Sequence, residues 1–164
     1  MNVKELFEMQ RELEQHIMEK HPELKDENNL YWKVLALQVE LGELANEWRG
    51  FKKWSSNQKP NREKLLEEYV DCLHCVISIG IDLGHNDFND DVKYPTVISR
   101  KFDYSIEFNS VFNASARIQY TGDYDYLTMP FIALGALLGF EWDEIEQAYK
   151  AKNEVNHARQ EANY

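Results

Sequence analysis

Four acidic residues of the chain stand in two pairs with the same spacing. Glu40 and Glu43 are three residues apart, and so are Glu68 and Asp71. In a helix this spacing puts both carboxylates of a pair on one face, one turn apart. Carboxylate oxygens are the ligands that hard divalent cations prefer, and Mg²⁺ held this way usually shares its coordination shell with substrate phosphates. Two such pairs on consecutive helices predict a Mg²⁺ site, with Mn²⁺ as a substitute.

The second pair borders a segment that is apolar almost all round, from Cys72 to Leu83. Its polar side chains fall on one narrow side of the predicted helix: Glu67, Glu68, Asp71, His74 and Ser78. Such a helix is expected to be buried, and burying unpaired carboxylates is costly unless a cation neutralises them. The alternative is a solvated or salt-bridged stripe, which is the usual meaning of a single pair. We favour the metal site because two pairs occur, one of them on an apolar helix.

Cationic and amide side chains end the last predicted helix. Lys152, Asn156 and Arg159 continue the face on which Ile145 and Tyr149 lie. This arrangement suits a phosphate clamp, because an arginine can hold two phosphate oxygens at once. The spacing alone leaves an equal alternative, in which the long side chains cover apolar surface or pair with glutamates.

Two further groups of residues carry weaker signals. Lys52 lies in a basic segment just past the second predicted helix, where Trp54 either stacks on a base or caps the core; for an isolated tryptophan we favour the core. Cys72 and Cys75 flank His74, but one CxxC motif without a second pair is weak evidence for zinc or redox chemistry. Buried, inert thiols and a core histidine are the simpler interpretation.

The hydrophobic pattern predicts the helices that must position these groups. Their expected ranges are 2–20, 30–48, 60–83, 103–119, 127–138 and 141–160. Only residues 96–98 and 102–108 are ambiguous between strand and helix. There is no internal repeat and no low-complexity linker, so we expect residues 1–164 to form a single all-α domain, a bundle of five to six helices.

The composition excludes several classes of function. The 164 residues carry 18 basic and 29 acidic side chains, a net charge of −11, which opposes binding to nucleic acid or to an anionic membrane surface. No segment approaches the roughly 18 apolar residues of a transmembrane helix, and the N-terminus turns acidic and amphipathic too early for a signal peptide. The two cysteines are too few for a disulfide framework. We therefore expect a cytoplasmic protein.

Several segments of the chain resemble the dimeric, all-α dUTPases, members of the wider all-α NTP pyrophosphatase group that includes MazG-type enzymes. The segments are residues 37–49, Phe51-Lys52-Lys53-Trp54, residues 67–74, and a closing K-N-x-x-N-x-x-R-Q motif over 152–160. Gln10 and Leu13 fit an N-terminal Q-x-x-L pattern. The two acidic pairs are common to the whole group, whereas the position of His74, the Phe-Lys-x-Trp segment and the closing motif point to dUTPases.

The resemblance implies a fold, a reaction and a set of residue roles. The implied fold has a four-helix core, and the implied assembly is a homodimer. In the implied reaction, a metal-activated water hydrolyses dUTP to dUMP and pyrophosphate, and dUDP is a second substrate that also yields dUMP. Glu40, Glu43, Glu68 and Asp71 are the implied Mg²⁺ ligands, with Glu43 more than Glu40 orienting or deprotonating the water. Lys152, Asn156 and Arg159 are implied to hold the triphosphate. The nucleoside pocket is implied for Gln10, Trp54 and His74, and Lys52 is a further candidate for substrate binding.

Two positions depart from the family pattern. Cys75 stands where the family typically has an aromatic residue that can exclude a ribose 2′-hydroxyl, and Glu14 lies near the place of an expected asparagine. Two other functions remain open at this point. One is a MazG-like pyrophosphatase with another or broader nucleotide choice. The other is a non-catalytic helical interaction module, which predicts exposed glutamates and no Mg²⁺ dependence; the apolar surroundings of Asp71 and His74 count against it.

Overall fold

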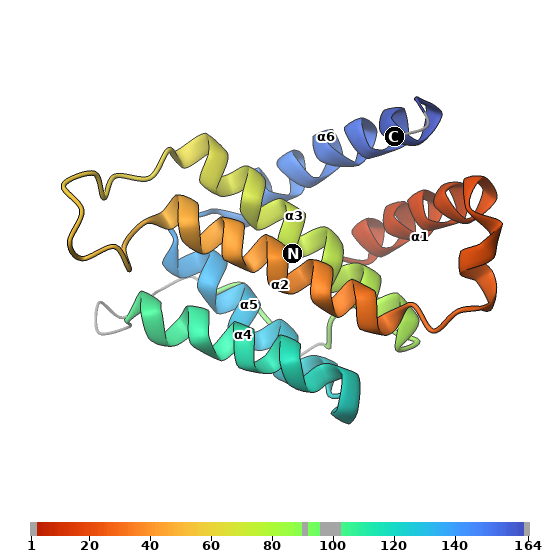
Figure 1. Cartoon of the computed structure of the whole chain (residues 1–164), viewed down its shortest axis with the longest axis horizontal. Coiled ribbons are helices and arrows are strands. Elements are labelled where there is room, and N and C mark those ends of the chain that lie inside the picture. The colour runs from red at the N-terminus through yellow and green to blue at the C-terminus, as the bar shows by residue number, and fades with distance from the viewer. Residues whose placement is uncertain (1–2, 90–91, 96–102, 163–164) are drawn as a thin grey trace.

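The computed structural model describes residues 3–89, 92–95 and 103–162. These residues form helices and connecting loops without any strand, which confirms the all-α prediction (Figure 1). The helices are α1 (Val3–Lys20), the short 3-10 helix η1 (Pro22–Asp26), α2 (Leu30–Trp48), α3 (Arg62–Asp82), α4 (Tyr104–Thr121), α5 (Tyr124–Leu137) and α6 (Trp142–Glu161). The ambiguous residues 96–98 lie outside the described part of the chain, whereas the described part of 102–108 begins α4.

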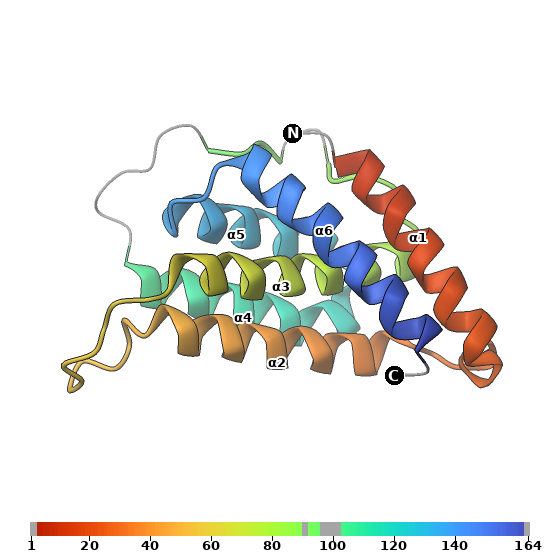
Figure 2. The same cartoon turned by 90° about the horizontal axis from the view of Figure 1, so that it is seen from above.

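Four of the helices close into the core bundle that the resemblance implied. α2 packs on α3 and α4, and α5 packs on α4 and α3, so that the contacts form a ring. α2 and α3 run antiparallel, joined by the loop over 49–61 (Figure 2). α1 and α6 pack against each other and against α3, outside this ring. α3 is therefore shared between the core bundle and the α1–α6 layer. Within the described residues, no helix is long and apolar enough to cross a membrane.

Side-chain caps fix where three helices begin. The Asn61 side chain accepts hydrogen bonds from the backbone N–H groups of Glu63 and Lys64 at the start of α3. Asp103 caps α4 in the same way, and Asp123 caps α5 through the N–H of Tyr126. Such caps satisfy N–H groups that have no partner within the helix. The Asp123 cap explains why α5 begins at Tyr124, earlier than the predicted 127.

A glycine allows α3 and α5 to approach closely. A Cβ atom added to Gly80 of α3 would lie 2.5 Å from the hydroxyl of Tyr124 at the start of α5. The same hydroxyl donates a hydrogen bond to the carbonyl of Val76, at 2.9 Å. The Tyr124 ring is fully buried, so it has no room to move aside. The absence of a side chain at residue 80 therefore sets how closely the two helices pack.

We expect Gly80→Ala to lower the free energy of unfolding by about 1–3 kcal/mol, because the added methyl overpacks the Tyr124 site. Urea denaturation followed by circular dichroism measures this change. The matched control is Gly42→Ala in α2, where a Cβ meets nothing within 4 Å. This control is expected to gain roughly 0.5–1 kcal/mol from helix propensity. Equal midpoints for the two variants would contradict the packing argument.

Candidate active site

Carboxylates from α2 and α3 face one another where the two helices pack. One oxygen each of Glu40, Glu68 and Asp71 can be chosen so that all three lie within 4.8 Å of one another. All three side chains are half-buried. The leucines of α2 hold this register, since Leu37, Leu41 and Leu44 are fully buried on the neighbouring face. The hydrophobic contact thus brings the two predicted acidic pairs together.

The cluster holds its negative charges against their mutual repulsion. Burial raises the pKa of the Glu40 carboxyl to about 7, and repulsion from Asp71, Glu43 and Glu68 adds to the effect. Burial also raises the pKa of Glu68, with Glu43 and Asp71 contributing. The pKa of Asp71 is raised by burial as well, although the hydrogen bond from Lys152 opposes this shift. A site that disfavours its own charged form in this way favours any cation that neutralises it.

Glu43 differs from the other three acidic residues. Its side chain is exposed, and it lies outside the tight three-residue group. It is still close enough for its charge to raise the pKa of both Glu40 and Glu68. The structure therefore places all four predicted carboxylates in one neighbourhood, with Glu43 on the solvent side.

A lysine of α6 already supplies a positive charge to the cluster. The Lys152 ammonium donates to Asp71 at 2.7 Å and to Glu67 at 3.1 Å. The positive charge of Arg159 also favours the ionised form of Asp71. Two of the predicted phosphate-binding residues thus lie beside the predicted metal ligands. Glu67, which the sequence analysis gave no role, is the second partner of Lys152.

A cavity of about 480 Å³ adjoins the carboxylates, between α1, α2, α3 and α6. Its walls include five residues that the sequence analysis selected: Gln10, Glu40, His74, Asn156 and Arg159. Because Glu40 belongs both to this cavity and to the acidic cluster, the two features form one continuous site. A larger cavity, of about 840 Å³, is lined among the described residues by 87–89, 92–95 and 139–143, and none of the predicted site residues lines it. Chemistry rather than size therefore selects the smaller cavity.

The inner wall of this cavity has a defined hydrogen-bonding pattern. The carbonyl oxygen of the Gln10 side chain lies 2.9 Å from His74 Nδ1, and it accepts a hydrogen bond of 2.9 Å from the Tyr149 hydroxyl. The imidazole stacks on the Tyr149 ring with the centroids 3.9 Å apart. Burial, with the nearby charge of Lys152, lowers the pKa of His74 to about 3, so the ring is neutral. Its Nε2 atom is buried without a hydrogen-bond partner among the described residues.

Sequence reasoning missed a buried ion-pair group in the same wall. The Lys33 side chain is only 4% exposed, and its ammonium donates to Glu14 at 3.1 Å and to Asp82 at 2.7 Å. Lys33 and Glu14 both line the cavity. A signal was present in the sequence, since Lys33 falls on the apolar face of α2, one turn before Leu37. Its partners were not visible because they come from α1 and α3.

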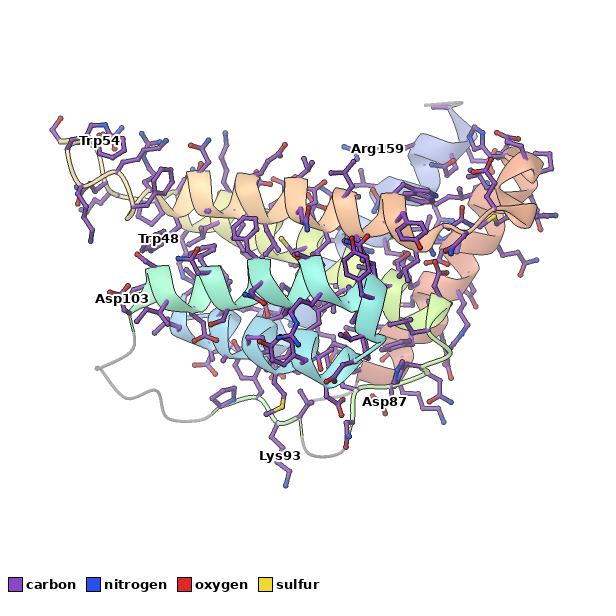
Figure 3. All side chains as sticks on the ribbon, turned by 60° about the horizontal axis from the view of Figure 1, so that its bottom comes forward. Trp48, Trp54, Asp87, Lys93, Asp103 and Arg159 are labelled. Carbon is purple, nitrogen blue, oxygen red and sulfur yellow. The ribbon has the colours of Figure 1, made fainter. Side chains whose placement is uncertain are left out.

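The structure does not bring Lys52 and Trp54 to this cavity. Both lie in the loop after α2, where the Lys52 ammonium donates to Asn46 at 2.5 Å and the Trp54 side chain is 81% exposed. Figure 3 shows Trp54 at the tip of this loop. Arg159, which belongs to α6, lies toward the opposite end of α2, on the side of α1. Within one copy of the chain, Trp54 neither caps the core nor faces Gln10 and His74.

Comparison with known families agrees with this geometry. A family model described as dUTPase matches residues 2–164. The chain belongs to the all-α dUTPase family. The dUTPase is thus a hydrolase that converts dUTP to dUMP, and the family generally depends on a divalent metal, for which the acidic cluster offers ligands. No curated protein matches the chain.

The raised pKa of Glu40 predicts a pH dependence of the metal-free dUTPase. Between pH 4.5 and about 7 the folded state binds more protons at Glu40 than the unfolded state does, so the free energy of unfolding falls as the pH rises through this window. We expect the free energy of unfolding of Glu40→Gln to decrease less than that of the wild type over the same pH window. At pH 8 the variant should be more stable than the wild type by on the order of 1 kcal/mol, a figure discounted for solvent screening.

Urea denaturation at pH 5 and pH 8 in the presence of EDTA measures this difference. Glu154→Gln, which neutralises an exposed glutamate of α6, is the control for the loss of one negative charge. A stability difference between Glu40→Gln and wild type that is the same at both pH values would contradict the assigned titration.

Proposed function

We propose that this dUTPase hydrolyses dUTP and dUDP with Mg²⁺ held by Glu40, Glu43, Glu68 and Asp71. The observation that carries the proposal is the continuity of the site, because Glu40 belongs to the acidic cluster and also lines the cavity of Gln10 and His74. A nucleoside triphosphate has the same two parts, a charged phosphate chain and a neutral nucleoside. The half-buried state of Glu40, Glu68 and Asp71 counts against the alternative of an interaction module, which required exposed glutamates.

The residues of the cluster fit a hard divalent cation. All the donors are carboxylate oxygens, three of them within 4.8 Å of one another, with no competing thiolate or imidazole in the group. The raised pKa of Glu40 and the contact of Lys152 with Asp71 both indicate a site that needs positive charge. When bound there, Mg²⁺ would neutralise phosphate charge and lower the pKa of a coordinated water.

The side chains around the cluster have separate proposed tasks. Glu43, exposed at the edge of the group, orients the attacking water and accepts its proton. Lys152 would exchange its contacts with Asp71 and Glu67 for phosphate oxygens once a bound cation neutralised the carboxylates. Arg159 and Asn156 line the cavity and hold the remaining phosphate oxygens. The cationic side chains also stabilise the charge that develops on the leaving phosphate.

Pyrophosphate release from dUTP, dTTP, dCTP, UTP and dATP, with and without Mg²⁺, tests the proposed function. We expect Mg²⁺-dependent turnover of dUTP above all others, and a loss of roughly 10²- to 10⁴-fold in kcat for Glu43→Gln, which cannot accept the proton. Glu12→Gln, on the exposed face of α1, is the control and keeps full turnover. Full turnover by Glu43→Gln would refute its role, and comparable turnover of several bases would favour a MazG-like specificity.

The same panel tests the role of Cys75. Its thiol lines the cavity, and burial raises its pKa to about 12, so it offers a small neutral group where the family typically has an aromatic ring. Comparable turnover of UTP and dUTP would show that this smaller group leaves space for a 2′-hydroxyl.

We propose further that the enzyme is a homodimer paired through α2. Tyr31, Leu35 and Val39 form a stripe on this helix and are 56%, 61% and 52% exposed. Because the stripe adjoins the cavity-lining face of the same helix, a second copy docked on it would border the cavity. A two-fold axis perpendicular to α2 would pair the two α2 helices antiparallel, so the loop over 49–61 of one copy would approach the cavity of the other. This pairing supplies a position for Trp54.

Shared sites predict a specific complementation. The Trp54→Ala and Glu40→Gln enzymes, each inactive or nearly so alone, should recover about one quarter of wild-type activity when co-expressed, because mixed dimers hold one intact site. The control pair, Glu40→Gln with Glu68→Gln, should recover nothing. Each acidic cluster is built from a single chain, so every site of the mixed dimer still carries one of the two defects. Sedimentation of wild type and Leu35→Glu measures the dimer itself. A dimer without complementation would remove Trp54 from the shared site.

Two predictions about the whole chain also remain proposals. A single domain over 1–164 is supported by one continuous hydrophobic cluster with members in all six α-helices. The cytoplasm is supported by the two cysteines, which are free thiols in this fold. Disulfides are rare in that compartment, and burial raises the pKa of both thiols, which keeps them neutral and unreactive.

A further inference from the structure

A chain of hydrogen bonds crosses the inner wall of the cavity from one end of α3 to its middle. It begins at Asp82, passes through the Lys33 ammonium to Glu14, and continues from Glu14 to the Gln10 side-chain amide at 3.4 Å. The amide oxygen of Gln10 then lies 2.9 Å from Nδ1 of His74. Three helices, α1, α2 and α3, contribute to this chain, and its last member, His74, carries the Nε2 atom that has no partner in the described part of the protein.

The chemistry of the groups fixes the direction of every bond in this chain. A lysine ammonium only donates, and an ionised carboxylate only accepts. Lys33 therefore donates to Oε2 of Glu14, and the other oxygen, Oε1, must receive its hydrogen bond from the NH₂ group of Gln10. The carbonyl oxygen of the same amide is then turned toward His74 and the Tyr149 hydroxyl.

The opposite orientation of the Gln10 amide conflicts with the same contacts. It would place the amide oxygen 3.4 Å from Oε1 of Glu14, with two acceptors and no proton between them. Glu14 is held in its place by the buried ammonium of Lys33, which contacts its Oε2 atom at 3.1 Å. The charge of this ion pair, two contacts away from His74, thus selects the orientation of the amide.

We propose that Lys33 and Glu14 are positioning residues that set the tautomer of His74 and so make its Nε2 atom a hydrogen-bond acceptor for the nucleoside. The Gln10 oxygen accepts, so Nδ1 of the neutral imidazole must carry the ring proton. Nε2 then presents a lone pair in a buried position for which the described residues supply no donor. The choice of the nucleoside as the ligand of Nε2 rests on the proposed function, whereas the tautomer follows from the contacts within the hydrogen-bond chain.

The ligand group that fits this atom is an N–H or O–H donor. A deoxyuridine nucleotide offers two, the N3–H of the uracil ring and the 3′-hydroxyl of the sugar. If Nε2 meets the base, cytosine is rejected, because its N3 carries a lone pair that would face another lone pair. A site built around one hydrogen-bonding pattern discriminates strongly against a ligand that leaves its buried group unpaired.

The ¹⁵N shifts of the His74 imidazole in the free enzyme, assigned by comparison with His74→Asn, test the tautomer without substrate or metal. We expect Nδ1 protonated and Nε2 bare in the wild type. Protonated Nε2 in the wild type would overturn the proposal, whatever the substrate of the enzyme proves to be. This measurement needs no variant of the hydrogen-bond chain, so it decides the question even if such variants do not fold.

Glu14→Gln is expected to invert the whole chain. Lys33 still requires an oxygen from residue 14, so the new amide turns its NH₂ group toward Gln10, which must flip and donate to His74. The ring proton then moves to Nε2. Glu12→Gln, two residues away on the exposed face of α1, is the matched control and keeps the wild-type tautomer. An unchanged tautomer in folded Glu14→Gln would refute the positioning role.

Kinetics with substrate analogues identify the donor. For dUTP, Glu14→Gln should raise KM about tenfold, the effect of roughly one hydrogen bond, with kcat within about twofold because the carboxylate cluster is untouched. One analogue should escape this increase: 3-methyl-dUTP if Nε2 meets the base, or 2′,3′-dideoxy-UTP if it meets the sugar. An equal KM increase for dUTP and both analogues would overturn the assignment of Nε2 as the nucleoside's acceptor.

Discussion

The packing of α2 on α3 forces like charges together, and the site depends on this constraint. The buried leucines of α2 and the apolar face of α3 fix the register of the two helices. Burial of each leucine stabilises the packed helices by about 2 kcal/mol. Together these contacts are enough to hold Glu40 of α2 close to Glu68 and Asp71 of α3 despite their repulsion. The result is a preformed concentration of negative charge that the chain relieves only in part, through Lys152.

The two halves of the site are held by different kinds of force. The acidic half is positioned by hydrophobic contact and remains electrostatically unsatisfied until a cation arrives. The cavity half is positioned by directional hydrogen bonds, with Lys33 buried among carboxylates from α1 and α3. α3 contributes Glu68 and Asp71 to one half and His74 to the other, so the spacing within a single helix sets the distance between them.

The parts of this site that could be predicted from the sequence are those with local signals. The two acidic pairs, the helix ranges and the closing cationic face each lie within one helix, where the spacing alone defines the face. The partners of Lys33 and the contact between Tyr149 and Gln10 join residues from different helices, and a single sequence carries no signal for them. The position of Trp54 was missed for a related reason, since its loop extends beyond the helices that the pattern predicts.

The position of α1 and α6 outside the core ring has a consequence for turnover. Within the described residues, the close backbone packing of this layer is on α3 and on itself, apart from η1, while the Lys33–Glu14 ion pair and the contact of Phe7 with Tyr124 tie α1 to α2 and α5 through side chains. The layer carries Gln10, Asn156 and Arg159, while the closed ring holds the carboxylates. Loosening the layer would break the Lys33–Glu14 ion pair, but it would leave the helix contacts that close the ring in place. This division places the cavity wall on the layer and the acidic cluster on the ring, so a shift of the layer would change the width of the cavity more than the geometry of the cluster.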